Sequence, residues 1–213
     1  MYTLVYHEHL AFRAAPIQML LLDAEAEFKM APPEWGEDRV VASNPGCAVF
    51  APPVLRKGDF TLGQTAAIMD YLGRAHGMLK GSTEQLATAN QLTLDVADIG
   101  SELFGVAKDA EKKAAFAQND PDGRLLKWLA HVGKVHARHE GPFLLTVEQP
   151  TPADFMLCSM FEALDFALGA AAVKLITPAT LQAWRATMQA RPFFAKFMAI
   201  GKPQLFPSMK FEA

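Results

Sequence analysis

Two positions in this sequence have polar side chains that can hold or stabilise an anion. Tyr6 lies near the end of a predicted strand over 3–8, where a fixed phenolic hydroxyl donates a hydrogen bond to a neighbouring anion. Gln64 and Thr65 open a predicted helix over 65–74, and the free amides and dipole at a helix N-terminus favour a bound carboxylate. Each position also has a structural interpretation, since a strand-end tyrosine can pack on the core and a threonine can cap its helix.

A third group of polar residues forms an acidic stripe. Asp95, Asp98 and Glu102 recur at helical spacing in a predicted helix over 84–106. Taken alone, such a stripe is typical of a solvated helix face.

The histidines do not have the spacing of a metal site. His7 and His9 lie close together, but no third ligand is nearby in the sequence. His131, His136 and His139 fall only partly on one helical face, which is typical of a solvated basic face. We therefore expect no metal cofactor.

The chain has two cysteines, Cys47 and Cys158, which are too few for a disulfide framework. No Cys-x-x-Cys motif is present, so a dithiol redox enzyme is not expected. Cys47 has two interpretations. It is a redox-sensitive thiol if it is exposed with a lowered pKa, and a small buried hydrophobe otherwise.

The first part of the chain has the pattern of a small α/β unit. Pro16 fits the first turn of a helix, where its missing N–H costs little. The order βαβ followed by ββα spans about 75 residues, and we expect this domain to cover 1–78. The predicted elements are strands at 3–8 and 27–30, strands on either side of a turn at 57–59, and helices over 14–25 and 65–74, with a long loop over 31–46.

Beyond a glycine-containing linker at 73–82, the chain has helical periodicity, and we expect a helical domain over 84–213. Thr151, Pro152 and Asp154 form the clearest helix start, with a capping box and a proline in the first turn. The predicted helices cover 84–106, 121–138, a buried segment after residue 151, and 181–199, the last interrupted at 191–192.

Composition excludes several function classes. The formal net charge of −3 argues against partners such as nucleic acid or an anionic membrane, which a basic stripe would bind. No run of uncharged apolar residues approaches the length of a membrane span, and the first residues lack the features of a secretory signal. We expect a reduced, cytoplasmic, globular protein.

Several short motifs, in this order and spacing, identify a family. They are YTLVY at the start, PVLRKGDFTLGQTAAI, YLGR, TPADF and ARPFFAKF. The chain resembles cytosolic glutathione transferases over essentially its whole length, the tyrosine-type classes most closely and the pi class above all. This resemblance implies an α/β N-terminal thioredoxin-like domain followed by an all-α C-terminal domain, which together make the glutathione transferase fold.

The resemblance also implies roles for individual residues. Tyr6 matches the catalytic tyrosine, whose hydroxyl stabilises the thiolate of glutathione. A free thiol has a pKa of about 8.5, so little thiolate exists at neutral pH unless a hydrogen-bond donor lowers that pKa. Gln64 and Thr65 match the residues that bind the γ-glutamyl carboxylate. Arg13 matches an arginine that supports the glutathione site, or is an exposed arginine near a helix start. Trp35 matches a tryptophan at the glycyl end of glutathione, or is an aromatic residue in a surface loop.

The resemblance places Pro53 at the cis-proline of the thioredoxin-like fold, with Pro52 beside the bound peptide. In the family, the residue before the cis-proline pairs both its N–H and its C=O with glutathione, and Pro52 has no N–H. The usual glutamine one position earlier is Ala51 here. Asp98 matches an aspartate that reaches the partner subunit's glutathione, which implies a homodimer.

The expected function is conjugation of glutathione, the co-substrate, to hydrophobic electrophiles in detoxification. Glutathione-dependent isomerisation or peroxide reduction would give the same sequence pattern. The alternative is a non-catalytic or weakly catalytic binding or structural protein of the same fold. Pro52, Ala51 and the altered loop after Tyr6 favour that alternative, whereas Tyr6 itself, Gln64, Thr65 and Asp98 favour the transferase.

Overall fold

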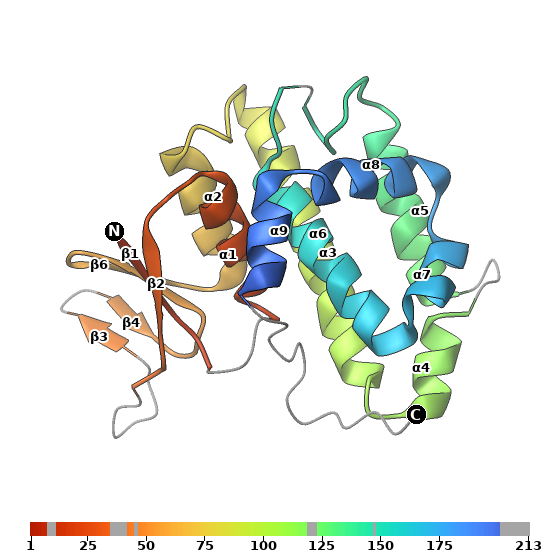
Figure 1. Ribbon diagram of the computed structural model, residues 1–213, viewed down its shortest axis with the longest axis horizontal. Helices are drawn as coiled ribbons and strands as arrows, with labels where there is room; N and C mark the ends of the chain where they lie inside the picture. The colour runs from red at the N-terminus through yellow and green to blue at the C-terminus, as the bar shows by residue number, and fades with distance from the viewer. Residues whose placement is uncertain (8–11, 35–41, 45–46, 119–122, 147, 201–213) are drawn as a thin grey trace.

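Figure 1 shows a small sheet-containing region packed beside a larger group of helices. The computed structural model describes residues 1–7, 12–34, 42–44, 47–118, 123–146 and 148–200. Within these residues, the N-terminal part is a small mixed sheet with two helices, and the part after residue 82 is helical. The predicted fold class is therefore confirmed.

The four-stranded sheet has the order β2-β1-β5-β6. Strand β1 pairs in parallel with β2 and antiparallel with β5, and β5 pairs antiparallel with β6. The β5–β6 turn contains Gly58 at φ +57, a left-handed conformation that glycine adopts without steric cost. The strand bounds are β1 Tyr2–Val5, β2 Phe28–Ala31, β5 Val54–Lys57 and β6 Phe60–Gly63.

Alternation along β1 determines what packs on each face of this sheet. Tyr2, Leu4 and Tyr6 belong to the main core cluster, whereas Val5 belongs to a small cluster with Val49 and Val54 on the other side. The main cluster also takes in buried residues of the helices α1 (Ala15–Asp23) and α2 (Thr65–Ala75). Tyr6 is thus held by core packing directly after the strand.

Two details of the N-terminal part differ from the sequence prediction. The predicted loop over 31–46 contains the strand β3 (Ala42–Asn44), which pairs with β4 (Cys47–Val49) as a separate two-stranded sheet. Strands of three residues are too short to show a periodic pattern. The predicted linker at 73–82 also starts too early, because α2 continues to Ala75 and a Cβ atom at Gly73 would lie 2.6 Å from Cγ of Pro152. Gly73 therefore permits close packing of α2 on the helical part.

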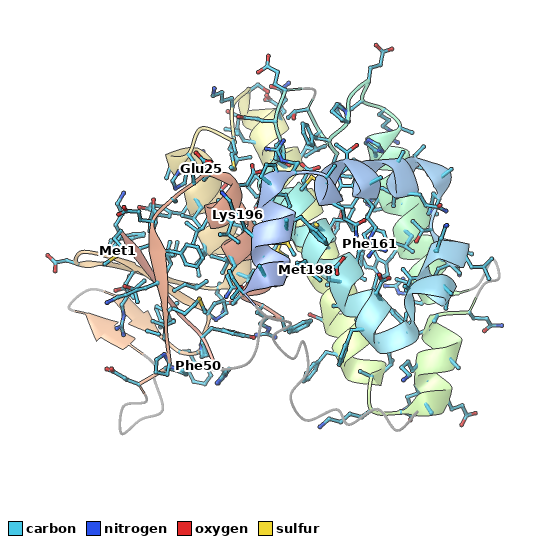
Figure 2. All side chains as sticks on the ribbon, viewed as in Figure 1. Met1, Glu25, Phe50, Phe161, Lys196 and Met198 are labelled. Carbon is cyan, nitrogen blue, oxygen red and sulfur yellow. The ribbon has the colours of Figure 1, made fainter. Side chains whose placement is uncertain are left out.

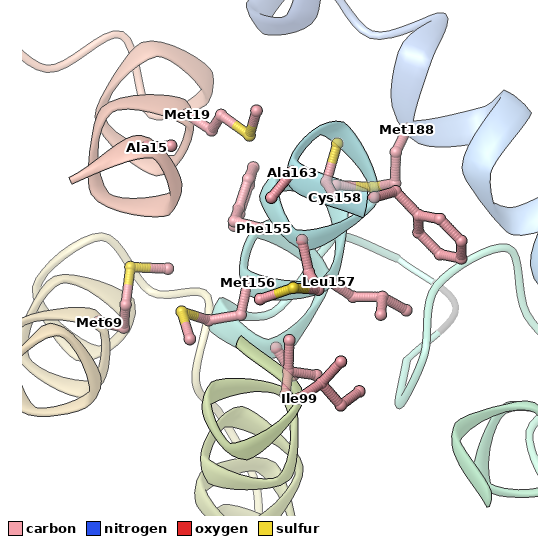
Figure 3. Close-up of a cluster of buried hydrophobic side chains, with 14 of the residues drawn as sticks. Ala15, Met19, Met69, Ile99, Phe155, Met156, Leu157, Cys158, Ala163 and Met188 are labelled. Atoms are coloured by element: carbon pink, nitrogen blue, oxygen red, sulfur yellow. The ribbon is translucent and has the colours of Figure 1, made fainter. Parts of the chain in front are cut away.

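Helix α6 lies at the centre of the helical part, where it packs against α1, α3, α7 and α8. Figure 3 shows side chains of α6 among residues of α1, α2 and α3, including Met19, Met69 and Ile99. The helices of this part are α3 Thr83–Val106, α4 Ala110–Phe116, α5 Arg124–His136, α6 Pro152–Leu168, α7 Ala170–Ile176, α8 Ala179–Gln189 and α9 Pro192–Ala199. None of the described helices is long and apolar enough to cross a membrane.

The start of α6 is fixed by a buried carboxylate. Thr151 and Asp154 form the predicted capping box, and Asp154 has no exposed surface. Its Oδ1 accepts hydrogen bonds from the Leu144 amide at 2.9 Å and from Trp184 Nε1 at 2.8 Å. Its Oδ2 accepts from the amide and the hydroxyl of Thr151 at 2.7 and 2.8 Å. One side chain thereby connects α6, α8 and the segment before them.

The last helix returns to the N-terminal part. Arg191, the N-cap residue of α9, donates from Nε and Nη2 to the two carboxylate oxygens of Asp23 at 2.8 and 2.9 Å. Lys196 and Glu25 are labelled close to each other in Figure 2, and Nζ of Lys196 lies 3.9 Å from Oε1 of Glu25. Helix α9 packs on α1, so both ends of the described chain take part in one contact.

Candidate active site

A cleft of about 330 Å³ lies between the N-terminal part and the helices α3 and α6. One wall is made by the turn before α1, the segment before β5 and the start of α2, and the other wall is made by α3 and α6. The described residues that line it are Phe12, Arg13, Pro16, Ala51, Pro52, Pro53, Gln64, Thr65, Ala66, Leu94, Ala97, Gly100, Ser101, Phe104, Met156, Ser159 and Met160.

A chain of hydrogen bonds brings three of the predicted site residues together. The backbone amide of Arg13 donates to the hydroxyl oxygen of Tyr6 at 3.3 Å. The Thr65 hydroxyl donates to the backbone carbonyl of Arg13 at 3.1 Å. Arg13 and Thr65 line the cleft, and the exposed Arg13 side chain supplies a positive charge there. The turn before α1 thus links the end of β1 to the start of α2.

Tyr6 is buried, with 6% of its surface exposed, and it is not among the residues that line the cleft. Burial raises the pKa of its hydroxyl, while the Arg13 amide and the Arg13 charge act in the opposite direction. The hydroxyl therefore keeps its proton at neutral pH and is a hydrogen-bond donor. The donor lies behind the backbone of Arg13 rather than at the surface of the cleft.

The start of α2 has the features of an anion site. Gln64 is the N-cap residue at φ +68 and ψ 121, and no side chain caps the helix. Left-handed φ is uncommon for a residue with a side chain, and such strain clusters at functional sites. The capping interpretation of Thr65 is not supported, because Thr65 is the first helical residue and its hydroxyl bonds to Arg13. The first amides of α2 remain available to a ligand.

The peptide bond between Pro52 and Pro53 is cis, as the resemblance implies for Pro53. Both prolines are buried, and both line the cleft together with the half-buried Ala51. Pro52 therefore offers its carbonyl at this wall and has no N–H to donate.

The acidic stripe on α3 is only partly exposed to solvent, so the prediction of a solvated face was incomplete. Asp95 lies 3.2 Å from Nε2 of His131, and Glu102 accepts hydrogen bonds from Arg124 and from the Trp128 indole. Two of the three carboxylates thus bind α5. Asp98 is exposed on α3 and is not among the lining residues.

The structure adds observations on the histidines and on Cys158. Among the described residues, no group of His, Cys, Asp and Glu is placed to hold a metal ion. His136 is buried with Nε2 3.2 Å from the Gly141 carbonyl, so the predicted solvated histidine face was wrong at this residue. Burial raises the pKa of the Cys158 thiol, which makes that thiol unreactive. Trp35, His9 and the side chain of Cys47 lie outside the described residues.

Sequence reasoning missed the apolar wall of the cleft. Its side chains come from α3 and α6 and include those of Leu94, Phe104, Met156 and Met160. The sequence does contain a signal for this wall, since residues at 97, 100, 101 and 104 recur at helical spacing and form one face of α3. The periodicity alone does not separate a face that lines a cleft from a face buried in the core.

Known proteins are similar to this chain in its helical region and in its overall fold. Residues 97–200 match the family model of the glutathione S-transferase C-terminal domain. A search of curated proteins found no match.

Three solved structures cover nearly the whole chain. A pi-class glutathione S-transferase of Onchocerca volvulus superposes with a TM-score of 0.75 at 17% identity, over 93% of this chain and 92% of its own. A glutathione S-transferase of Ascaris lumbricoides has a TM-score of 0.71 at 18% identity, over 94% and 97%. NaGST-2 has a TM-score of 0.71 at 17% identity, over 96% and 98%.

These similarities agree with the two-part architecture. At these identities, the structures establish the fold, and the family model establishes the nature of the helical region. The chain therefore has the glutathione transferase fold, and its region 97–200 matches the C-terminal domain of glutathione S-transferases.

Proposed function

We propose that this protein is a glutathione transferase that adds the glutathione thiolate to hydrophobic electrophiles. The observation that carries the proposal is the composition of the cleft. Arg13, Gln64 and Thr65 line one wall, and apolar side chains of α3 and α6 line the other. A charged peptide and an apolar acceptor can therefore bind side by side in one cleft.

In the proposed complex, the γ-glutamyl carboxylate lies at the start of α2. The free amides of that helix donate to the carboxylate, and Arg13 adds a positive charge to the same wall. When the ligand binds, the Thr65 hydroxyl turns from the Arg13 carbonyl and donates to the carboxylate instead. The peptide lies along Pro52 and Pro53, and Trp35 contacts its glycyl end. These assignments follow the resemblance in sequence, and the shared position at the cleft supports those of Arg13, Pro52, Pro53, Gln64 and Thr65.

The proposed role of Tyr6 is to stabilise the thiolate. A buried, protonated hydroxyl that already accepts a hydrogen bond from the Arg13 amide keeps its own O–H for the sulfur. The sulfur must then approach Tyr6 next to the Arg13 backbone. The nucleophile is the ligand's own sulfur, so the protein supplies position and electrostatic stabilisation and forms no covalent intermediate.

Two further features belong to the same proposal. Asp98, exposed on α3, reaches the γ-glutamyl ammonium of the partner subunit in a homodimer. The N-terminal glutathione-binding domain covers residues 1–78 and the helical domain covers 84–213, with the cleft between them.

A binding protein that has lost conjugation is the second candidate, and two observations favour it. Pro52 offers no N–H to the cysteinyl carbonyl, a loss of about 1 kcal/mol, and the Tyr6 ring does not line the cleft. A glutathione-affinity column followed by a thiolate titration separates the candidates. Failure to bind contradicts the transferase.

The deciding measurement is the near-UV absorbance of the thiolate of bound glutathione between pH 5 and 9. A transferase shows a thiolate band at neutral pH that disappears in Tyr6→Phe, while glutathione still binds. Saturable binding without the band in the wild-type protein supports the binding protein instead.

A further inference from the structure

A methionine at the edge of the sheet has a buried amide directed at its sulfur. Met30 lies on β2, an edge strand of the four-stranded sheet, and 40% of its surface is exposed. It pairs in register with Leu4, so its side chain lies on the same face of the sheet as Leu4, the face that α1 covers. There Nε2 of Gln18, on α1, donates a hydrogen bond to Sδ of Met30 at 3.2 Å.

Gln18 is a buried polar side chain whose hydrogen bonding is incomplete. Only 4% of its surface is exposed, and its Oε1 has no hydrogen-bond partner among the described residues. A thioether sulfur is a weak acceptor, so the donor end of the same amide has only a weak partner. Because a buried amide with weak or missing partners costs free energy, a stronger acceptor at the position of the Met30 sulfur would stabilise the fold.

Oxidation of Met30 supplies such an acceptor. When hydrogen peroxide transfers an oxygen atom to Sδ, the S–O bond forms, the O–O bond breaks and water leaves. The sulfur is oxidised by two electrons and the peroxide is reduced. The product is a methionine sulfoxide, a polar group whose oxygen accepts hydrogen bonds. Since the methionine side chain has three rotatable bonds, this oxygen can turn toward Nε2 of Gln18.

Exposure directs the oxidant to this residue. Within the part of the chain that the structure describes, Met30 and Met1 are the exposed methionines, at 40% and 72%, whereas Met19 and Met69 have no exposed surface. Met30 therefore combines access for a peroxide with a buried donor placed to bind the product.

We propose that Met30 is a site of reversible oxidation by hydroperoxides, and that Gln18 stabilises the sulfoxide form. Neither side chain is among the described residues that line the cleft, so this site is separate from the proposed transferase site. A methionine sulfoxide reductase reverses the step: the oxygen leaves as water, and two thiols supply the electrons and protons as they form a disulfide.

Urea unfolding of the untreated and the peroxide-treated protein tests the proposal, with peptide mass spectrometry to follow the oxygen added at each methionine. Gln18→Leu keeps apolar volume and removes the donor. Oxidation should raise the unfolding equilibrium constant of this variant by roughly threefold to tenfold more than that of the wild-type protein, the value of one net hydrogen bond. The untreated variant should fold, because an apolar group in place of a poorly partnered buried amide costs little.

Two further measurements separate Met30 from the other methionines. Met30→Leu is the matched control, since peroxide treatment of this variant measures the effect of oxidation at all other positions. Nuclear magnetic resonance gives a direct signature: the side-chain amide protons of Gln18, assigned by their loss in Gln18→Leu, should move downfield when Met30 is oxidised, as expected for a stronger hydrogen bond.

The outcomes bear on the two parts of the proposal separately, and none of them depends on glutathione. An equal effect of oxidation on the wild-type protein and on Gln18→Leu overturns the role of Gln18, as do unshifted Gln18 amide protons. Oxidation of Met30 no faster than that of the buried Met19 and Met69 overturns the site itself. A larger effect in Gln18→Leu, together with the shifted amide protons, supports both parts.

Discussion

At Tyr6, core packing and the proposed chemistry both favour a hydroxyl that keeps its proton. The ring is buried in the core, and that burial raises the pKa of the hydroxyl. A higher pKa keeps the donor protonated, which suits a group that stabilises an anion without losing its own proton. The Arg13 amide at 3.3 Å fixes the orientation of the oxygen.

This raised pKa predicts how stability changes in alkaline solution. The unfolded chain releases the tyrosine proton near pH ~10, whereas the folded protein retains it, so the contribution of Tyr6 to stability falls as the pH rises above ~10. Relative to Tyr6→Phe, the wild-type protein should lose unfolding free energy as the pH rises above ~10. Urea titrations of both proteins at several pH values measure the difference, and parallel curves would contradict the assignment.

The buried environment of Asp154 predicts a large loss of stability when its carboxylate is removed. Its carboxylate accepts four hydrogen bonds in a site without solvent, so Asp154→Ala leaves buried donors of Leu144 and Trp184 without an acceptor. We expect a loss of about 3 kcal/mol or more, a large share of the stability of a protein of this size. Urea unfolding followed by tryptophan fluorescence measures it. Thr187→Ala removes an exposed hydroxyl bond on α8 and should change stability little, and a similar loss in both variants would refute a special role for the buried site.

At the level of elements, α9 depends on one ion pair with a distant part of the chain. Arg191 is half-buried and binds the buried carboxylate of Asp23 through two nitrogen atoms. Because Arg191 is also the N-cap residue of α9, the ion pair fixes the point where this helix meets α1.

We predict that Arg191→Met destabilises the docking of α9 by about 2 kcal/mol, because it leaves Asp23 buried without its partner. Hydrogen exchange of the α9 amides should become faster, while that of the α8 amides changes less. Lys196→Met is the control, since Lys196 is exposed and 3.9 Å from the exposed Glu25. Equal effects of the two variants would show that the bidentate pair does not hold α9.

Elements also differ in how well the sequence predicted them. The start of α6 was predicted because three local signals lie in adjacent positions. Thr151 and Asp154 form a capping box, Pro152 fits the first turn, and an apolar run follows. Helices α4 and α7 have seven residues each, which is too short for a helical period to stand out. The turn at Gly58 and the helix start at Thr65 carried their own local signals, so the sheet side of the cleft was predicted from residues close together in the sequence.

At the level of the whole molecule, the apolar side of the cleft depends on contacts that no local pattern contains. Phe12 meets Phe104 across the two parts of the chain, and Gly100 meets Met160 between α3 and α6. These distances follow from how α6 packs between α1 and α3. The wall with Arg13, Gln64 and Thr65 was therefore predictable from motifs, whereas the apolar wall required the tertiary structure.

The proposed homodimer leads to the last prediction, because it would place two halves of one site on different subunits. If Asp98 acts on the partner's ligand, Asp98→Asn and Thr65→Ala each weaken glutathione binding in their own homodimers. Thr65→Ala loses a hydroxyl hydrogen bond, and Asp98→Asn loses the negative charge opposite the ammonium, which should cost roughly tenfold or more in Kd. A heterodimer of the two variants contains one site with both changes and one site with neither. Calorimetry on heterodimers purified through two different tags should then find one site per dimer with the wild-type Kd. An Asp98→Asn homodimer with the wild-type Kd would show that Asp98 has no part in the site. If that homodimer binds weakly and the heterodimer shows no recovery, Asp98 acts within its own subunit, because only a contribution across a two-fold interface can restore an intact site from two defective chains.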